Sequence, residues 1–211
     1  MQGNLRQGEH IPLLSTAGLM RCDARSTGAF CMSTPDFSSA ASRLCAPCGM
    51  CCDGVLFHFV KLQPGDSAQA LAALGLKVKR KRKQDCILQP CSAHAECSCT
   101  IYQARPVRCR VFECKQLHRV AAGAITEAAA VGKISEAKIL VGEINALLLR
   151  LGAMNLRQPL SKRCESVLSE FPDPPSDVAT AEARSQLAAA MHALEVLLDQ
   201  HFRIEPSDSA A

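Results

Sequence analysis

The spacing of apolar positions separates a regular C-terminal half from a less regular N-terminal half. Across residues 126–151, apolar side chains recur at steps of three and four, which predicts a long amphipathic helix that Gly152 ends. After the breaker sequence FPDPPSD, the same spacing predicts a second long helix over 177–202. Residues 109–122 fit a further helix that would stop near Gly123. We therefore expect helices that pack on one another.

The N-terminal half contains shorter signals. The stretch VLFHFVKLQ at 55–63 alternates weakly between apolar and polar positions and predicts a strand. It precedes a short predicted helix that Asp66 or Ser67 caps and Gly75 ends.

Residues 1–42 are rich in Ser, Thr, Gly and Arg and have no sustained period, so we expect them to be disordered. Met32 opens a plausible start of its own, and we hypothesise that the native chain begins there, which the intact mass of the natively expressed protein would test. Cys22 and Cys31 lie in this segment and receive no role.

The predicted fold class is α+β, with three regions along the chain. After the disordered segment 1–42, residues 43–116 form a small, irregular cysteine-rich module. Residues 117–205 form a mainly helical region that packs on this module. The chain has no Trp and a single Tyr, so large aromatic side chains contribute little to its core. A bound metal is the expected substitute, because metal-binding energy at a site absent from the unfolded chain is folding energy.

Thirteen cysteines indicate the compartment and the chemistry. An odd number fits poorly with a secreted disulfide scaffold, and the first twenty residues lack the pattern of a signal peptide. No apolar run reaches the length of about 20 residues that a membrane span needs. We therefore expect a cytoplasmic protein with no membrane association. Clustered cysteines in that reducing compartment are typical of metal or redox sites.

The formal net charge of +4 is concentrated in one place. The run KVKRKRK at 77–83 carries six positive charges, so the remainder of the chain is slightly acidic. The run is compatible with polyanion binding, but it contains no aromatic residue that would stack on bases. We interpret it as a solvated loop and expect no nucleic-acid partner.

Ten of the cysteines lie between positions 45 and 114, and four of these occur in the sequence CAPCGMCC at 45–52. Cys45, Cys48 and Cys51 are spaced as C-x2-C-x2-C, which is the spacing of zinc ligands and also of the start of a bacterial ferredoxin motif. Cys52 follows Cys51 directly, and adjacent side chains point in different directions, so Cys52 serves a second site or a structural role. The spacing does not choose between zinc and an iron–sulfur cluster.

Arginines surround the later cysteines. Arg105, Arg108 and Arg110 bracket Cys109, and their guanidinium groups would offset the negative charge of a thiolate-bound metal.

The sequence CAPCGMCC, followed by QPC and then by CTIYQARPVRCRVFEC, resembles the YkgJ-type CxxCxxCC family of zinc- or iron-chelating proteins. The match covers roughly residues 45–114. Carried over to this chain, the resemblance implies a set of eight metal ligands: Cys45, Cys48, Cys51, Cys52, Cys91, Cys99, Cys109 and Cys114. Eight thiols suffice for two four-ligand sites, or for one cluster with thiols to spare. Cys86 and Cys97 match no family position.

Other residues near the cysteines have two readings each. Tyr102 either lies in the core or supports the metal site, with the core favoured. Arg105 either shapes the turn before Pro106 or supports the metal ligands. His94 and His118 would complete a site, but a solvent-facing position is favoured for both. Cys164 is interpreted as a small apolar residue of a helix.

Three functions remain open. The first is a zinc- or iron-binding protein without a reaction of its own, which has the metal ion as partner and a protein partner through its helical region. The second is an iron–sulfur redox protein or enzyme accessory, and the third is a nucleic-acid-binding zinc module. No nucleotide-binding loop and no hydrolase or zinc-protease motif occurs, which weighs against an enzyme.

Overall fold

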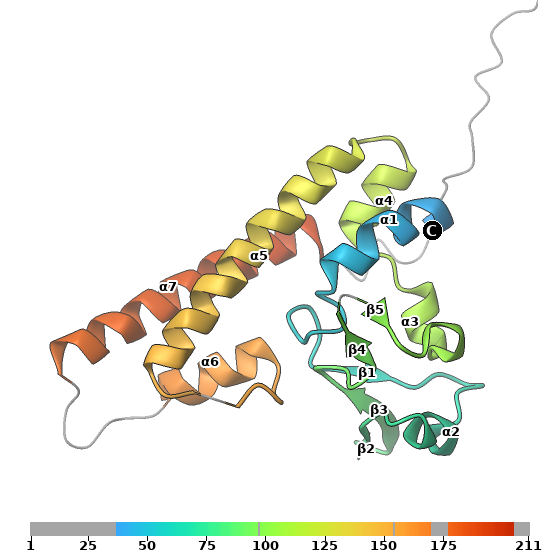
Figure 1. Ribbon diagram of the computed structural model, residues 1–211, viewed down its shortest axis with the longest axis horizontal. Coiled ribbons are helices and arrows are strands. Elements are labelled where there is room, and N and C mark those ends of the chain that lie inside the picture. The colour runs from blue at the N-terminus through green and yellow to red at the C-terminus, as the bar shows by residue number, and fades with distance from the viewer. Residues whose placement is uncertain (1–36, 97, 154, 170–176, 205–211) are drawn as a thin grey trace, which may run out of the picture. The chain divides into compact units, whose positions relative to one another are not determined.

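A computed structural model describes residues 37–96, 98–153, 155–169 and 177–204. The chain divides into Met1–Ser33, which lies outside the described residues, and the unit Thr34–Ala211. This unit has the predicted α+β fold, in which small antiparallel sheets are followed by a helical C-terminal half (Figure 1).

The larger sheet contains three antiparallel strands in the order β1-β3-β2: β1 (Phe59–Lys61), β3 (Gln84–Leu88) and β2 (Val78–Lys81). Val60 of β1 and Val78 of β2 both pair with Ile87 of the central strand. Ile87 is buried against α2 (Ala68–Ala73) in a small core that is separate from that of the long helices. The predicted strand and the predicted short helix are both confirmed, and Ser67 caps α2 by accepting a hydrogen bond from the Ala70 amide.

The basic run forms a β-hairpin, so its interpretation as a loop is wrong. Lys79, Arg80 and Lys81 lie on the edge strand β2, and Arg82 and Lys83 form the turn to β3 with φ of 46° and 68°. The run has no alternation of apolar and polar residues that would predict a strand, because β2 is exposed on nearly its whole length. Lysines on an edge strand discourage pairing with another chain, which is a sufficient structural reason for the run.

Two short strands, β4 (His94–Ala95) and β5 (Ser98–Cys99), form a second sheet and lead into the 3-10 helix η1 (Tyr102–Ala104). The helix predicted over 109–122 is two helices, α3 (Val107–Val111) and α4 (Lys115–Ala121). Between them Phe112 is extended, and its ring packs edge-on against Phe57 with centroids 4.9 Å apart. This packing interrupts the helix although the sequence there contains neither Gly nor Pro.

The two long helices are confirmed as α5 (Glu127–Arg150) and α7 (Val178–His201), which lie side by side in Figure 1. Thr126 and Asp177 cap them by accepting hydrogen bonds from the amides of Ala129 and Thr180. A third helix, α6 (Leu160–Ser169), packs against both; Cys164 was expected on a helix, and the structure supplies its bounds. Side chains from α5 and α7 that are no more than 1% exposed dominate the larger core: Ile144, Leu148, Leu187, Leu194, Leu198 and, just after α7, Phe202.

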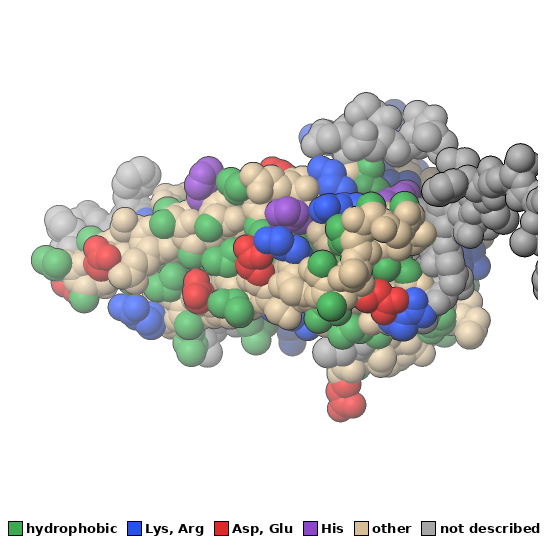
Figure 2. Space-filling view, turned by 90° about the horizontal axis from the view of Figure 1, so that it is seen from above, with side chains coloured by type: hydrophobic (Ala, Val, Ile, Leu, Met, Phe, Trp, Pro, Cys, Tyr) green, Lys and Arg blue, Asp and Glu red, His purple; other side chains and the backbone are tan. Residues whose placement is uncertain are grey.

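The first described helix, α1 (Phe37–Cys48), begins inside the segment expected to be disordered, so residues 37–42 of that segment are helical. Met32, Cys22 and Cys31 lie outside the described residues. Within the described residues, no helix is long and apolar enough to cross a membrane. Apolar side chains also reach the surface of the long helices, among charged residues of both signs (Figure 2), and Val131, Ile139 and Leu149 of α5 are each 46% exposed or more.

Candidate metal centre

The cysteine-rich sequence begins in the last turn of α1, which carries Cys45 and Cys48. Gly49 ends the helix in the left-handed region, with φ of 71°, and its amide donates to the Cys45 carbonyl over 3.0 Å. The chain then turns again, and the Cys52 amide donates to the Gly49 carbonyl over 2.8 Å. This second turn carries Cys51 and Cys52, and it is held in place by Met50, which is 1% exposed in the larger core.

Gly49 is required both for its backbone conformation and for space. A Cβ at this position would lie 3.0 Å from Cε1 of His94, whose ring packs over the turn. Gly65 has φ of 95°, and a Cβ there would meet nothing within 4 Å, which makes it a matched control. We expect Gly65→Ala to lower stability by about 1 kcal/mol through backbone strain, and Gly49→Ala by roughly twice that, because the alanine must also displace His94.

The measurement for this pair is the thermal unfolding midpoint of each protein as purified. If the unfolding midpoint falls no further in Gly49→Ala than in Gly65→Ala, the contact with His94 does not contribute to the loss of stability.

Cys114 is remote in sequence, but the fold brings it to Cys45, Cys48 and Cys51. It is the N-cap residue of α4, which packs against α1. Burial raises the pKa of Cys114, and the backbone amides in the first turn of α4 act in the opposite direction. Cys45, Cys48, Cys51 and Cys114 are referred to below as the first thiol group.

The other four predicted ligands come together from four different segments. The Cys91 amide donates to the Cys52 carbonyl over 2.7 Å, which ties the segment after β3 to the turn after α1. Cys99 lies on β5 opposite His94 of β4, and Cys109 lies on α3. Cys52, Cys91, Cys99 and Cys109 are referred to below as the second thiol group.

Electrostatic interactions among the thiols support this division. Burial is the main cause of a raised pKa in the first group, and it raises the pKa of Cys48 to about 12. The neighbouring sulfur atoms add to this effect: Cys114 raises the pKa values of Cys45, Cys48 and Cys51. Because Coulomb interactions weaken with distance, thiols that act on one another in this way are neighbours in space.

The second group shows the same behaviour among its own members. Burial, followed by the effects of Cys91, Cys109 and Cys99, raises the pKa of Cys52 to about 12. Burial, followed by Cys91 and Cys99, raises the pKa of Cys109 to about 11. The one interaction that crosses between the groups joins Cys51 to its sequence neighbour Cys52. The adjacent cysteines thus point into different groups.

The two groups also pack on different cores. Cys48, Cys51 and Cys114 contact the larger core of the long helices. Cys91 and Cys109 contact the smaller core between α2 and the three-stranded sheet. For these five thiols, packing gives the same division as electrostatics.

Of the supporting residues predicted around the thiols, Arg105 acts on both groups. Its positive charge lowers the pKa values of Cys45 in the first group and Cys109 in the second, against the larger effect of burial. Its Nε donates to the Tyr102 carbonyl over 3.0 Å, and its guanidinium lies 3.6 Å from the centroid of the Tyr102 ring. Tyr102 is 52% exposed, so its assignment to the core is wrong, and its ring instead holds Arg105. Arg110 lies on an exposed part of α3.

Neither thiol group includes Cys86, Cys164, His94 or His118. Cys86 is 1% exposed in β3, and Cys164 is 1% exposed in α6, where it fills the core as expected of a small apolar residue. Cys97 lies outside the described residues. His118 is exposed and faces Glu113 at 3.4 Å, whereas His94 is half-buried over Gly49.

The donor chemistry fits a soft metal, although the arrangement is not that of a closed site. Four cysteines without carboxylates are the donor set of a structural zinc ion or of an iron–sulfur cluster. Among the residues described, no group of three or more His, Cys, Asp or Glu side chains is arranged so that it could hold a metal ion as it stands. Closing either group around an ion therefore requires its sulfur atoms to move toward a common centre, by side-chain rotation about flexible torsions.

Residues 44–132 match the model of the CxxCxxCC family, described as "Putative zinc- or iron-chelating domain". This segment contains all eight cysteines of the two thiol groups, together with α3, α4 and the start of α5. No curated protein and no solved structure matches the chain.

Proposed function

We propose that this chain, whose residues 44–132 match a zinc- or iron-chelating family, is a metal-binding protein with two separate centres. The first thiol group would hold one centre and the second thiol group the other. The proposal is supported by the electrostatic division of the eight predicted ligands into two sets of four, with which the packing of five of them agrees. Four thiolates complete the coordination of a tetrahedral zinc ion or of one iron–sulfur cluster, so neither centre needs a ligand from the other.

Positive charge near the sulfur atoms would stabilise these centres. A four-thiolate zinc site carries a net charge of −2, which stabilising groups must offset. Arg105 is placed to act on both centres, and the positive end of α4 lies next to Cys114, its N-cap residue. Arg105 and Tyr102 are therefore positioning residues in this proposal.

The proposal includes the cytosolic location, because a reducing compartment keeps all these cysteines as free thiols. A role for the helical region in binding a protein partner stays a prediction.

Metal content tests the proposal directly. Protein purified without oxygen and without a metal-affinity column is expected to contain two centres per chain. Colourless protein with two zinc ions would identify zinc centres, and brown protein with iron and acid-labile sulfide would identify iron–sulfur clusters. Protein that contains neither metal, and that takes up neither after reduction, would end the proposal.

A further inference from the structure

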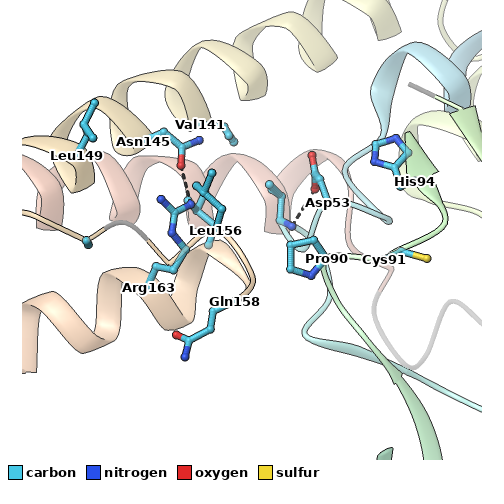
Figure 3. Close-up of a pocket in the computed structure, with 13 residues that line it drawn as sticks. Asp53, Pro90, Cys91, His94, Val141, Asn145, Leu149, Leu156, Gln158 and Arg163 are labelled. Carbon is cyan, nitrogen blue, oxygen red and sulfur yellow. Dashed lines mark hydrogen bonds between the residues drawn. The ribbon is translucent and has the colours of Figure 1, made fainter. Parts of the chain in front are cut away.

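A cavity of about 480 Å³ lies between the turn that follows Cys52 and the helices α5 and α6, and Cys91 of the second thiol group lines one end of it. Its volume is in the ordinary range of small-molecule sites. Much of the wall is apolar: it includes Val141 and Leu149 of α5, Leu160 at the start of α6, and Leu156 in the segment before α6. Figure 3 shows polar side chains at two places: Asn145, Gln158 and Arg163 gather at one end, and Asp53 and His94 lie at the other.

Arg163 is the unusual member of this cavity. It is only 8% exposed, and its guanidinium forms one hydrogen bond to a described residue, from Nη1 to Oδ1 of Asn145 over 2.7 Å. Its Nε is buried and has no hydrogen-bond partner. No Asp or Glu among the described residues forms an ion pair with it.

A buried guanidinium without an anion is costly. Removing a charge from water costs several kcal/mol unless a counter-ion and hydrogen bonds replace the lost hydration. Burial lowers the pKa of Arg163, in the direction expected for a cation without a compensating carboxylate. Hydrogen bonding to one neutral amide compensates this charge only in part, and an anion from outside the chain would complete the site.

The shape of the free donors and the lining of the cavity restrict the anion. Nε is enclosed by the protein and Nη1 donates to Asn145, so Nη2 is the charged donor left for an oxygen of a carboxylate. A single cation balances a monoanion, and Asp53 on the same cavity disfavours a dianion such as a phosphate monoester. The apolar side chains of the wall suit a hydrocarbon body.

We propose that this cavity binds an amphipathic monocarboxylate, with the carboxylate on Arg163 and the apolar body along α5 and the start of α6. Asn145 acts as a positioning residue that holds the guanidinium toward the cavity. The proposal assigns a ligand site between the cysteine-rich module and the helical half, and the carboxylate contact at Arg163 does not depend on which metal the thiol groups hold.

The experiment is isothermal titration of the protein as purified with hexanoate, and with three analogues of the same chain length: hexylammonium, hexanol and hexyl phosphate. Hexanoate is expected to bind at least tenfold more tightly than each analogue, because only hexanoate provides one negative charge in a planar group. Arg163→Met keeps the length of the side chain and removes its charge, so we expect it to lose at least tenfold in affinity for hexanoate. Arg157→Met, in the exposed segment before α6, is the matched control and is expected to bind like the wild type.

Stability gives a second readout that does not require a ligand. Without added ligand, Arg163→Met is expected to unfold at the same temperature as the wild type or higher, because it removes an uncompensated buried charge. Saturating hexanoate is expected to raise the midpoint of the wild type and not that of the variant. The proposal is overturned if hexanoate does not bind at millimolar concentration, if hexylammonium or hexanol binds equally well, or if Arg163→Met retains wild-type affinity. Preferential binding of hexyl phosphate would overturn the carboxylate assignment.

Discussion

Replacing Cys48 with serine is expected to remove one of two metal centres and to destabilise the protein by several kcal/mol. Cys48 lies in the last turn of α1, packs on the larger core, and interacts with Cys45 and Cys114 of the first thiol group. A structural metal supplies about 10 kcal/mol of binding free energy that is also folding free energy, and a serine hydroxyl is a poor replacement for a thiolate ligand. Metal analysis and the midpoint of thermal unfolding would measure the two effects.

The division into two groups makes the expected result specific. Cys48→Ser should keep the centre of the second thiol group, so its metal content should fall by half and not to zero. Cys109→Ser should give the mirror result, and the double variant should bind neither metal. Cys164→Ala is the matched control: this cysteine is buried in the larger core but belongs to neither group, so the variant should lose packing energy and keep both centres. A full metal load in Cys48→Ser would rule out the assignment of Cys48, and complete loss would indicate a single shared site.

The elements predicted correctly are those whose burial pattern is local. In α5 and α7 the apolar positions repeat every three or four residues, the caps Thr126 and Asp177 stand at the start, and the same positions are buried in the structure. The helix expected around Cys164 had no predicted bounds, because the ten residues of α6 carry few apolar side chains and Arg163 is one of its buried residues. The sequence did not signal that an arginine would point inward.

The division of the thiols depends on contacts that are far apart in sequence. The spacing of Cys45, Cys48 and Cys51 predicts that they belong together, and this is a local property. The break between α3 and α4 cannot be read from residues 109–122, because it follows from the packing of Phe112 on Phe57. That break makes Cys114 the N-cap residue of α4 and places it beside α1. The fourth member of the first group is therefore set by tertiary structure.

Metal affinity is expected to rise steeply with pH. In the metal-free fold, burial raises the pKa of Cys48 and Cys52 to about 12 and that of Cys109 to about 11, all above the ordinary thiol value of 9.0. These thiols are therefore protonated near neutral pH, whereas a metal binds the thiolate. Each thiol must release its proton on binding, and each released proton makes the apparent affinity rise about tenfold per pH unit.

The stability of the metal-free protein is expected to change with pH in the opposite direction. A thiol whose pKa is higher in the folded state than in the unfolded state favours folding in its neutral form. This contribution is fully present below about pH 9, and it is lost as the pH rises through the folded-state values near 11 to 12. The metal-free protein should thus become less stable above pH 9, in the range where the thiolates would bind metal most tightly.

Proton release during titration with zinc measures, at fixed pH, how zinc binding is coupled to deprotonation of the thiols. In weakly buffered solution at pH 7, the metal-free, reduced protein is expected to release about four protons for each zinc ion bound, which a pH indicator dye would report. Competition with a chromophoric chelator at several pH values should give a slope of log affinity against pH of about four per centre. Cys109→Ser provides the control, because it leaves only the first thiol group to titrate and should halve the total release without changing the number per ion. Fewer than two protons per zinc ion would show that the thiols are already ionised in the fold, and that burial does not control metal uptake.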